Sequence, residues 1–220
     1  MKRRVVNLFI ILSMLFGLFQ TTIANYPISV GPFLGLKGGV NAADVPWQNY
    51  NGFAFSNLPE MGISSYFPFV QNASFGGGLN LTYSTDGFLM SYKDGVHPEK
   101  KTTHQYNFFS ISPYLYASGF ILGLNIALPI GGTQEINSET TDVSSDLLAT
   151  MFEIKLGGVI TVYANEYGRF NIMIEGSYAL SGMLKDDYKG NDGSYYNYHP
   201  GQMWFGINYM FNLQKPLETE

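Results

Sequence analysis

The sequence predicts an all-β protein: a closed antiparallel up-and-down transmembrane β-barrel of about eight strands, after an N-terminal signal peptide. Three observations predict it. Charged residues make up 13% of the 220 residues, against a usual ~25%, whereas aromatic residues reach 16%. Beyond the first 24 residues no apolar run is long enough for a membrane-spanning helix. Apolar residues instead alternate with small or polar ones, which is the period of a β-strand in a membrane barrel.

The first 24 residues have the three parts of a secretory signal peptide. The positive residues 2–4 precede an apolar run at 5–19, and the small residue Ala24 marks the cleavage point. This run is shorter than the ~20 residues that span a bilayer, so we favour a signal peptide over an uncleaved anchor. The barrel domain is then expected over 25–212, with a short polar tail at 213–220. Because the exported chain has no cysteine, it fits the envelope of a Gram-negative bacterium better than a secreted disulfide scaffold.

The alternation of apolar residues locates the strands. It is clearest over 120–130, 152–162, 170–180 and 203–211, and weaker over 34–40, 75–83, 88–92 and 106–116. In the first of these segments, Leu122 and Leu124 share a face, and Gly123 and Asn125 occupy the other. These eight segments give about eight strands.

The predicted connections alternate in length. Short turns are expected at 84–87, 117–119 and 163–169, and long loops at 41–72, 93–105, 131–147 and 181–201. Short turns at one end and long loops at the other are typical of an outer-membrane barrel, with the short turns in the periplasm. Both ends of the chain then lie in the periplasm, which requires an even number of strands.

The two faces of each strand distinguish a membrane barrel from a soluble one. The bulky apolar face carries aromatic residues near strand ends, such as Phe152, Phe170 and Phe211, whereas the other face is rich in Gly, Ser and Asn. This pattern favours a wall that faces lipid, with outer-membrane lipid and lipopolysaccharide as its surroundings. A secreted soluble sandwich or a lipocalin-like barrel remains the alternative, with its apolar face turned inward.

Three segments resemble small outer-membrane β-barrel proteins of the PorT-like or OmpA/OmpX-like type. Residues 35–41 (Gly-Leu-Lys-Gly-Gly-Val-Asn) resemble the first strand of that group, and 106–116 resembles its fourth strand. The closing strand, which ends at Phe211, resembles the aromatic-terminated strand that the barrel-assembly machinery reads, although nine residues follow it here. The resemblance implies an eight-stranded barrel in the bacterial outer membrane and implies no reaction.

Four charged residues are predicted to point into the lumen: Lys37, Glu153, Lys155 and Glu175. Buried charges need partners, and two lysines balance two glutamates. We therefore predict a salt-bridge network that fills the narrow barrel. A gated ion path is the sharper alternative, but eight strands leave an interior just wide enough for side chains.

The three histidines do not form a recognisable catalytic or metal site. His97, His104 and His199 all fall in predicted long loops, and Ser194 and Asp192 are near His199 only in sequence. The acidic run 186–193 lacks the ligand order of a calcium loop and is explained by turn chemistry. We therefore predict no catalytic residue, no cofactor and no metal site.

Two loops contain aromatic residues that are candidates for contact with a ligand. Trp47, Phe53 and Phe55 lie in the first loop, which is predicted to fold over the barrel mouth. Tyr195, Tyr196 and Tyr198 lie in the last one, where tyrosines among Gly, Ser and Asn are typical of binding loops. The third loop, 131–147, has four acidic residues and no basic one.

These observations support a structural or surface-interaction role, with long loops as contact sites for a surface ligand. Two alternatives stay open: transport of a small hydrophobic molecule through the aromatic first loop, as in OmpW-like barrels, and lipid modification by a loop histidine. Nucleic acid is excluded as a partner, because the net charge is −5 and basic residues cluster only at the N-terminus.

Overall fold

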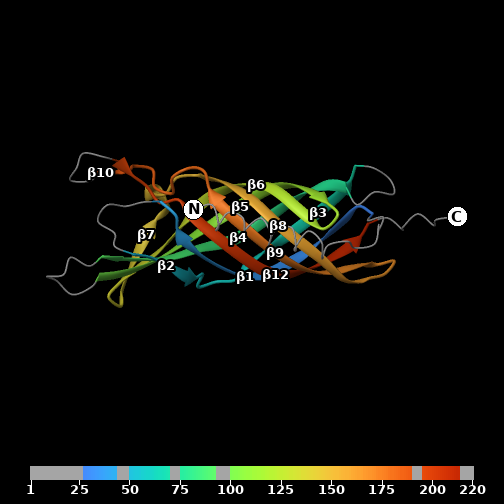
Figure 1. Cartoon of the computed structure of the whole chain (residues 1–220), viewed down its shortest axis with the longest axis horizontal. Coiled ribbons are helices and arrows are strands. Elements are labelled where there is room, and N and C mark those ends of the chain that lie inside the picture. The colour runs from blue at the N-terminus through green and yellow to red at the C-terminus, as the bar shows by residue number, and fades with distance from the viewer. Residues whose placement is uncertain (1–26, 44–49, 70–74, 93–99, 190–194, 214–220) are drawn as a thin grey trace, which may run out of the picture.

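The computed structural model describes residues 27–43, 50–69, 75–92, 100–189 and 195–213, which form a β-barrel (Figure 1). The predicted signal peptide lies outside the described residues, as does the C-terminal tail after Leu213. Within the described ranges, no helix has the length and hydropathy that crossing a membrane requires.

Most of the barrel consists of long strands. The elements in chain order are β1 (Ser29–Asn41), β2 (Tyr50–Phe55), β3 (Glu60–Pro68), β4 (Phe75–Tyr92), β5 (Lys100–Ala117), β6 (Phe120–Ile136), β7 (Glu139–Ser144), the 3-10 helix η1 (Ser145–Leu147), β8 (Met151–Ala164), β9 (Gly168–Ala179), β10 (Tyr188–Lys189), β11 (Tyr195–Tyr196) and β12 (Pro200–Asn212).

The sheet closes on itself. Each strand pairs antiparallel with its neighbour in the order β12-β9-β8-β6-β5-β4, then β2 and β3, then β1, and β1 pairs β12 again from Ser29↔Asn212 to Asn41↔Pro200. Because β2 and β3 pair the same two neighbours, β1 and β4, at different heights, they share one place in the ring. The ring therefore has eight strand positions, which confirms the predicted closed barrel.

The connections distinguish the two ends of the barrel. The end that holds Ser29 and Asn212 also has the connections 118–119 and 165–167, the end of β3 and the start of β4, and the β6–β7 hairpin and the β10–β11 pair lie at the opposite end (Figure 1). At 118–119, Ser118 and Gly119 have φ of 47° and 92°, as a two-residue hairpin turn of type I′ requires. Short turns beside the first and last strands are typical of the periplasmic end of such a barrel, so we call this end periplasmic and the opposite end extracellular.

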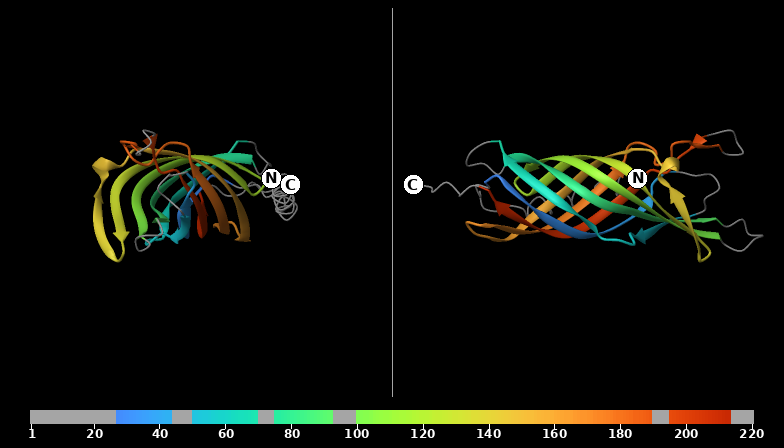
Figure 2. Two further views of the ribbon diagram at one scale, coloured as in Figure 1. Left: turned by 60° about the vertical axis from the view of Figure 1, so that its left-hand side comes forward. Right: turned by 180° about the vertical axis from the view of Figure 1, so that it is seen from behind.

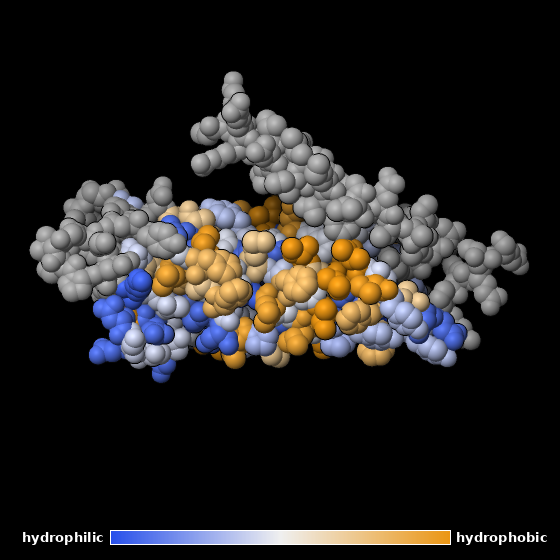
Figure 3. Space-filling view, turned by 60° about the horizontal axis from the view of Figure 1, so that its bottom comes forward, coloured by the Kyte–Doolittle hydropathy of each residue, from blue (hydrophilic) through white to orange (hydrophobic). Residues whose placement is uncertain are grey.

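Bulky apolar side chains face outward around the ring, as the alternation predicts. Leu36, Leu124 and Phe205 have exposed fractions of 64%, 56% and 56%, whereas their neighbours Lys37, Asn125 and Trp204 are buried. On the face shown in Figure 3, apolar residues cover the middle of the wall and polar residues gather toward its ends. A closed ring leaves no unpaired backbone edge in this apolar band, so the wall can face lipid.

The turn predicted at 84–87 is wrong. β4 runs without interruption through Ser84, Thr85, Asp86 and Gly87 and pairs β5 along its whole length. A turn here would have reset the alternation and placed Phe88 outside, but the continuous strand places it inside, fully buried. The sequence Ser-Thr-Asp-Gly is typical of turns, yet here the aspartate faces the lumen and a Cβ on Gly87 would meet Gln105 and the Phe55 carbonyl oxygen at 2.9 Å.

The prediction of a long loop at 41–72 is also wrong, because two strands occupy part of this segment. β2 and β3 lie within it and together supply the second position of the ring. Its high apolar content is explained by lipid-facing residues of the wall, such as Met61, Ile63 and Phe67. The predicted number of strands is right because the sequence interpretation split β4 into two and omitted this position.

The three other predicted loops are shorter than expected. β5 begins at Lys100, within the predicted loop 93–105. The predicted loop 131–147 contains the end of β6, all of β7 and η1, and β10 pairs β11 within 181–201. None of residues 101–103 and 139–142 is buried, so the alternation of apolar residues is weak there in the sequence.

The free energy of unfolding tests the lipid-facing wall. Leu124→Arg, in the middle of the apolar band on β6, is expected to lower it by about 2–4 kcal/mol, because a charge on a lipid-facing side chain is costly near the bilayer centre. Urea unfolding in lipid vesicles, followed by tryptophan fluorescence, measures it. The matched control Tyr167→Arg, at the periplasmic turn, is expected to cost about 0–1 kcal/mol. Equal costs at the two positions would contradict a membrane barrel.

Candidate functional site

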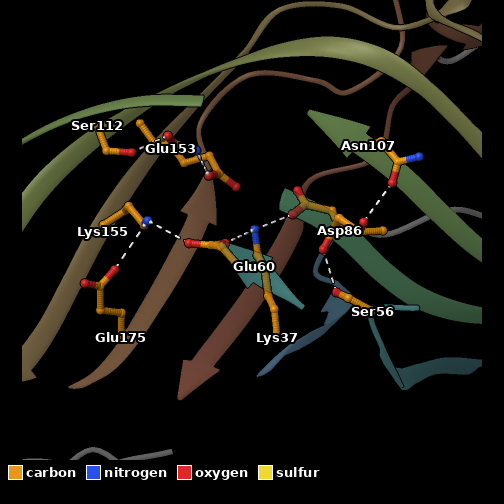
Figure 4. A network of polar contacts seen from close by, with 11 residues as sticks. Lys37, Ser56, Glu60, Asp86, Asn107, Ser112, Glu153, Lys155 and Glu175 are labelled. Atoms are coloured by element: carbon orange, nitrogen blue, oxygen red, sulfur yellow. Dashed lines mark hydrogen bonds and ion pairs between the residues drawn. The ribbon is translucent and has the colours of Figure 1, made fainter. Parts of the chain in front are cut away.

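The middle of the lumen holds a network of buried charged side chains contributed by five strands (Figure 4). Lys37 on β1 reaches two carboxylates: its Nζ lies 2.5 Å from Asp86 Oδ1 and 3.3 Å from Glu60 Oε2. Lys155 on β8 lies 3.3 Å from Glu175 Oε2 on β9 and 3.8 Å from Glu60 Oε1. Glu60 thus joins the two lysines across the lumen.

Glu153 lies in the same part of the lumen, where one of its two carboxylate oxygens is hydrogen-bonded to an amide side chain. Its side chain is 1% exposed, and Oε2 accepts a hydrogen bond from Asn125 Nδ2. The Oδ1 atom of Asn125 accepts a hydrogen bond of 2.6 Å from the Ser112 hydroxyl. A relay of neutral donors therefore orients this carboxylate, since a buried charge requires hydrogen bonds.

The network contains two residues that sequence reasoning did not place in it, Glu60 and Asp86. Glu60 was assigned to a loop and Asp86 to a turn, yet both are buried in the lumen. A signal for Asp86 was present in the sequence, because the alternation of Leu79, Leu81 and Tyr83 continues through it and puts even-numbered residues inside. With these two, four carboxylates face two lysines, so the predicted balance of two against two does not describe this part of the lumen.

The wall beside the network is interrupted between β2 and β3, and side chains replace the missing backbone pairs. The amide N–H of Ser56 donates to the Lys37 carbonyl, and its hydroxyl donates to the Thr85 carbonyl. Gln105 donates to the Phe55 carbonyl and accepts from the Asn57 N–H, both at 2.9 Å. The interruption therefore leaves these backbone groups satisfied, as a membrane wall requires.

Two clusters of buried side chains flank the polar network. The extracellular cluster includes Phe88, Tyr106, Phe108, Met151 and Tyr198. The periplasmic cluster includes Phe33, Tyr66, Tyr116, Met173 and Trp204. Two cavities in the lumen have volumes of about 20 and 10 Å³, which is room for a water molecule or two. The lumen in the described part of the chain is therefore packed with side chains.

The two histidines that the structure describes contact aromatic groups and the backbone. His104, predicted in a loop, lies on β5 and is 1% exposed; it stacks on Phe88, and its Nδ1 lies 2.8 Å from the Tyr106 hydroxyl oxygen. His199 Nδ1 lies 3.1 Å from the Ala179 carbonyl oxygen. His97, Asp192 and Ser194 lie outside the described residues. Within the described residues, no group of three or more potential ligand side chains is placed to hold a metal ion.

The structure does not bring the six predicted loop contact residues together. Phe53 and Phe55 lie on β2 and point outward, with exposed fractions of 48% and 70%, and not over the mouth as a lid. Tyr198 is buried in the extracellular cluster, Tyr195 pairs Lys189 in the β10–β11 ladder, and Tyr196 is half-buried. Trp47 lies outside the described residues.

At the extracellular end, β2, β4, β5, β6 and β7 continue as one sheet, and the β6–β7 hairpin stands at its edge (Figure 2). We call residues 100–107, 131–136 and 139–144 the extracellular ribbon. It begins at a register shift between Asn107 and Phe108 and ends in a turn in which Asn137 and Ser138 have φ of 49° and 73°. Asn137 N–H donates to the Lys101 carbonyl, which ties the tip to β5.

Comparison with known proteins adds little to this geometry. No protein-family model and no curated protein matches the chain. Similar solved structures include Ail, the attachment invasion locus protein of Yersinia pestis, in complex with the heparin analogue sucrose octasulfate (12% identity, 84% of this chain, 99% of that one, TM-score 0.43). Neisserial surface protein A is 10% identical over 82% of this chain and 95% of that one, with a TM-score of 0.37. The outer membrane protein OprG of Pseudomonas aeruginosa is 11% identical over 87% of this chain and 100% of that one, with a TM-score of 0.37.

The chain's own geometry determines its class. The ring is closed, its outer band is apolar, and the short turns lie beside the start of β1 and the end of β12. A barrel with these three properties spans a bilayer with satisfied backbone groups, and in bacteria it belongs to the outer membrane. The small outer-membrane barrel that the resemblance implies is therefore the fold of this chain.

Removing one lysine tests the lumen network. Lys37→Met leaves Asp86 and Glu60 with one cation fewer, and breaking a buried ion pair costs about 3–5 kcal/mol. Adding Asp86→Asn is expected to recover part of this loss, with a coupling of about 1–3 kcal/mol between the two sites. Urea unfolding in vesicles measures Lys37→Met, Asp86→Asn and the double variant. Lys101→Met, at an exposed position, is the control and is expected to stay within about 0.5 kcal/mol; additive effects at Lys37 and Asp86 would contradict the pair.

Proposed function

We propose that this chain is a surface-interaction protein of the outer membrane, and that the extracellular ribbon is its contact site. The observation that carries the proposal is an ordered, polar sheet that continues past the apolar band. On β7, Val143 packs against the extracellular cluster, whereas Glu139, Thr140, Thr141 and Asp142 are all exposed and add nothing to the membrane wall. A binding surface accounts for their presence.

The packed lumen supports this assignment over transport. The charged network lies between two clusters of buried side chains, and the lumen cavities are the size of water molecules. Phe53 and Phe55, which suggested a port for a hydrophobic molecule, point outward from β2. We therefore expect no route for a small hydrophobic molecule past the charged network.

The surroundings of the histidines favour a binding protein over an enzyme. His104 contacts aromatic groups, and His199 contacts a backbone carbonyl. General-base chemistry needs a histidine beside a nucleophile with an acid to orient it, and the contacts of these two side chains supply neither. We therefore expect no lipid modification at these two histidines.

Conductance tests the closed lumen. The purified barrel, inserted in planar lipid bilayers, is expected to show no steady current at 100 mV in 1 M KCl, because packed side chains occupy the lumen. An open porin measured in the same bilayers is the positive control. A steady channel current that appears with each insertion of this protein would contradict the proposal and favour transport.

Shortening the ribbon tests the contact site. Gly132 pairs Val143, and by the alternation along the ladder this pair is hydrogen-bonded, so residues 133–142 can be replaced by Asn-Gly to close a shorter hairpin with a type I′ turn. Cells that display the wild-type protein are expected to adhere several-fold more to wells coated with serum proteins, collagen or mucin than cells without it, and the short variant is expected to lose this gain.

The control for folding is the electrophoretic shift between unboiled and boiled samples, which the short variant is expected to retain because the eight-position ring is unchanged. If the short variant adheres at the wild-type level on every coat that retains wild-type cells, the ribbon is not the contact site. If cells that display the wild-type protein adhere no better than cells without it, the proposed function is contradicted.

A further inference from the structure

The outer edge of β7 is a sheet edge open to pairing. β7 pairs β6 from Ile136↔Glu139 to Gly131↔Ser144, and among the described residues no strand pairs its other side. Its six residues present an edge of roughly 20 Å. Such an edge has backbone N–H and C=O groups that can pair with another extended chain.

The hairpin geometry shows which residues direct their backbone groups to this edge. Hydrogen-bonded and non-hydrogen-bonded pairs alternate along an antiparallel ladder, and the pair that flanks a two-residue turn is hydrogen-bonded. Here that pair is Ile136 and Glu139. Thr140 and Asp142 therefore point their N–H and C=O groups away from β6, toward the free edge.

The edge lacks several of the usual devices that prevent strand addition. Proteins protect edges with proline, lysine, bulges or very short strands, and residues 139–144 contain no proline or lysine. Thr140 and Thr141 favour extended backbone, and the ladder with β6 is regular along its six pairs. The edge is therefore straight and regular enough to take a further strand.

The acidic side chains beside the free edge of β7 determine which kind of strand can pair with it. Glu139 and Asp142 point to opposite faces of β7, because their positions differ by an odd number. Glu135 on β6 lies opposite Thr140 and so shares a face with Asp142. The segment 131–147 contains no basic residue, and Lys101 lies on β5, beyond β6. Both faces beside the free edge are thus acidic.

We propose that the free edge of β7 binds an extended basic segment of another protein, which adds to the extracellular ribbon as a further strand. This inference rests on the proposed function and names its partner by chemistry. Main-chain hydrogen bonds supply affinity, and basic side chains on both faces of the added strand pair with Glu139 and Asp142. A second copy of this chain is disfavoured as the occupant, because two β7 edges would place like charges side by side.

A peptide-binding measurement on the full-length purified barrel tests the inference. The probe is a fluorescent seven-residue peptide that alternates lysine with threonine, and the matched peptide carries glutamate in place of lysine. At 50 mM salt the wild-type barrel is expected to bind the lysine peptide at least tenfold more tightly than the glutamate peptide, by fluorescence polarisation. Equal affinity, or no binding of the lysine peptide, would overturn the proposal.

Two variants separate charge from strand addition. Glu139→Lys combined with Asp142→Lys is expected to reverse the preference between the peptides, whereas Glu166→Lys, at the periplasmic turn, is the matched charge control and is expected to leave it unchanged. Thr140→Pro keeps the charge but removes one edge N–H, and proline is tolerated there because that N–H does not pair β6. This variant is expected to weaken binding of the lysine peptide at least tenfold.

Wild-type affinity in Thr140→Pro, with the electrophoretic shift retained, would show attraction by charge alone and would overturn strand addition. The adhesion assay separates this failure from failure of the proposed function. If the short hairpin loses adhesion but Thr140→Pro and the charge-reversed variant keep it, the ribbon remains the contact site and the basic partner strand is wrong. If the short hairpin keeps adhesion, the proposed function itself fails.

Discussion

Closure of the ring between β1 and β12 is the constraint on which the rest of the molecule depends. In lipid every backbone N–H and C=O needs a partner inside the protein, so an open edge in the apolar band would be costly. Eight strand positions meet this demand with the narrow lumen of a small barrel. That narrowness forces Lys37, Lys155 and their carboxylates into contact with one another, because bulk water cannot accompany them.

The same constraint explains the interruption between β2 and β3. A break in one strand would expose backbone groups of β1 and β4 to the membrane, and Ser56 bonds such groups on both strands. Gln105 bonds the backbone groups of Phe55 and Asn57 at the break itself. The break also brings Glu60 into the lumen at the start of β3, opposite both lysines. An irregular wall and a connected charge network thus have one structural origin.

Periodicity predicted the parts of the fold where lipid and lumen impose opposite demands on successive residues. On β6, the outward direction of Leu122 and Leu124 was predicted correctly, because both lie in the apolar band. The prediction failed where a local signal competed with the long-range one. Ser84 to Gly87 has turn chemistry, but pairing with β5 and the ion pair of Asp86 keep the strand extended. The alternation of faces along each strand was enough to predict the lumen positions of Lys37, Glu153, Lys155 and Glu175. The position of Glu60 could be predicted only with knowledge of how β3 pairs.

Glu60 also relates the two halves of the chain to each other. Lys37, Glu60 and Asp86 belong to strands before the β5–β6 turn, and Lys155 and Glu175 belong to strands after it. One carboxylate therefore contacts a cation from each half-shell. A one-residue slip between the half-shells would turn charged side chains from the lumen to the lipid. If the chain were cut at the β5–β6 turn, the two fragments would carry in their inner charges the information needed to reassemble in the native register.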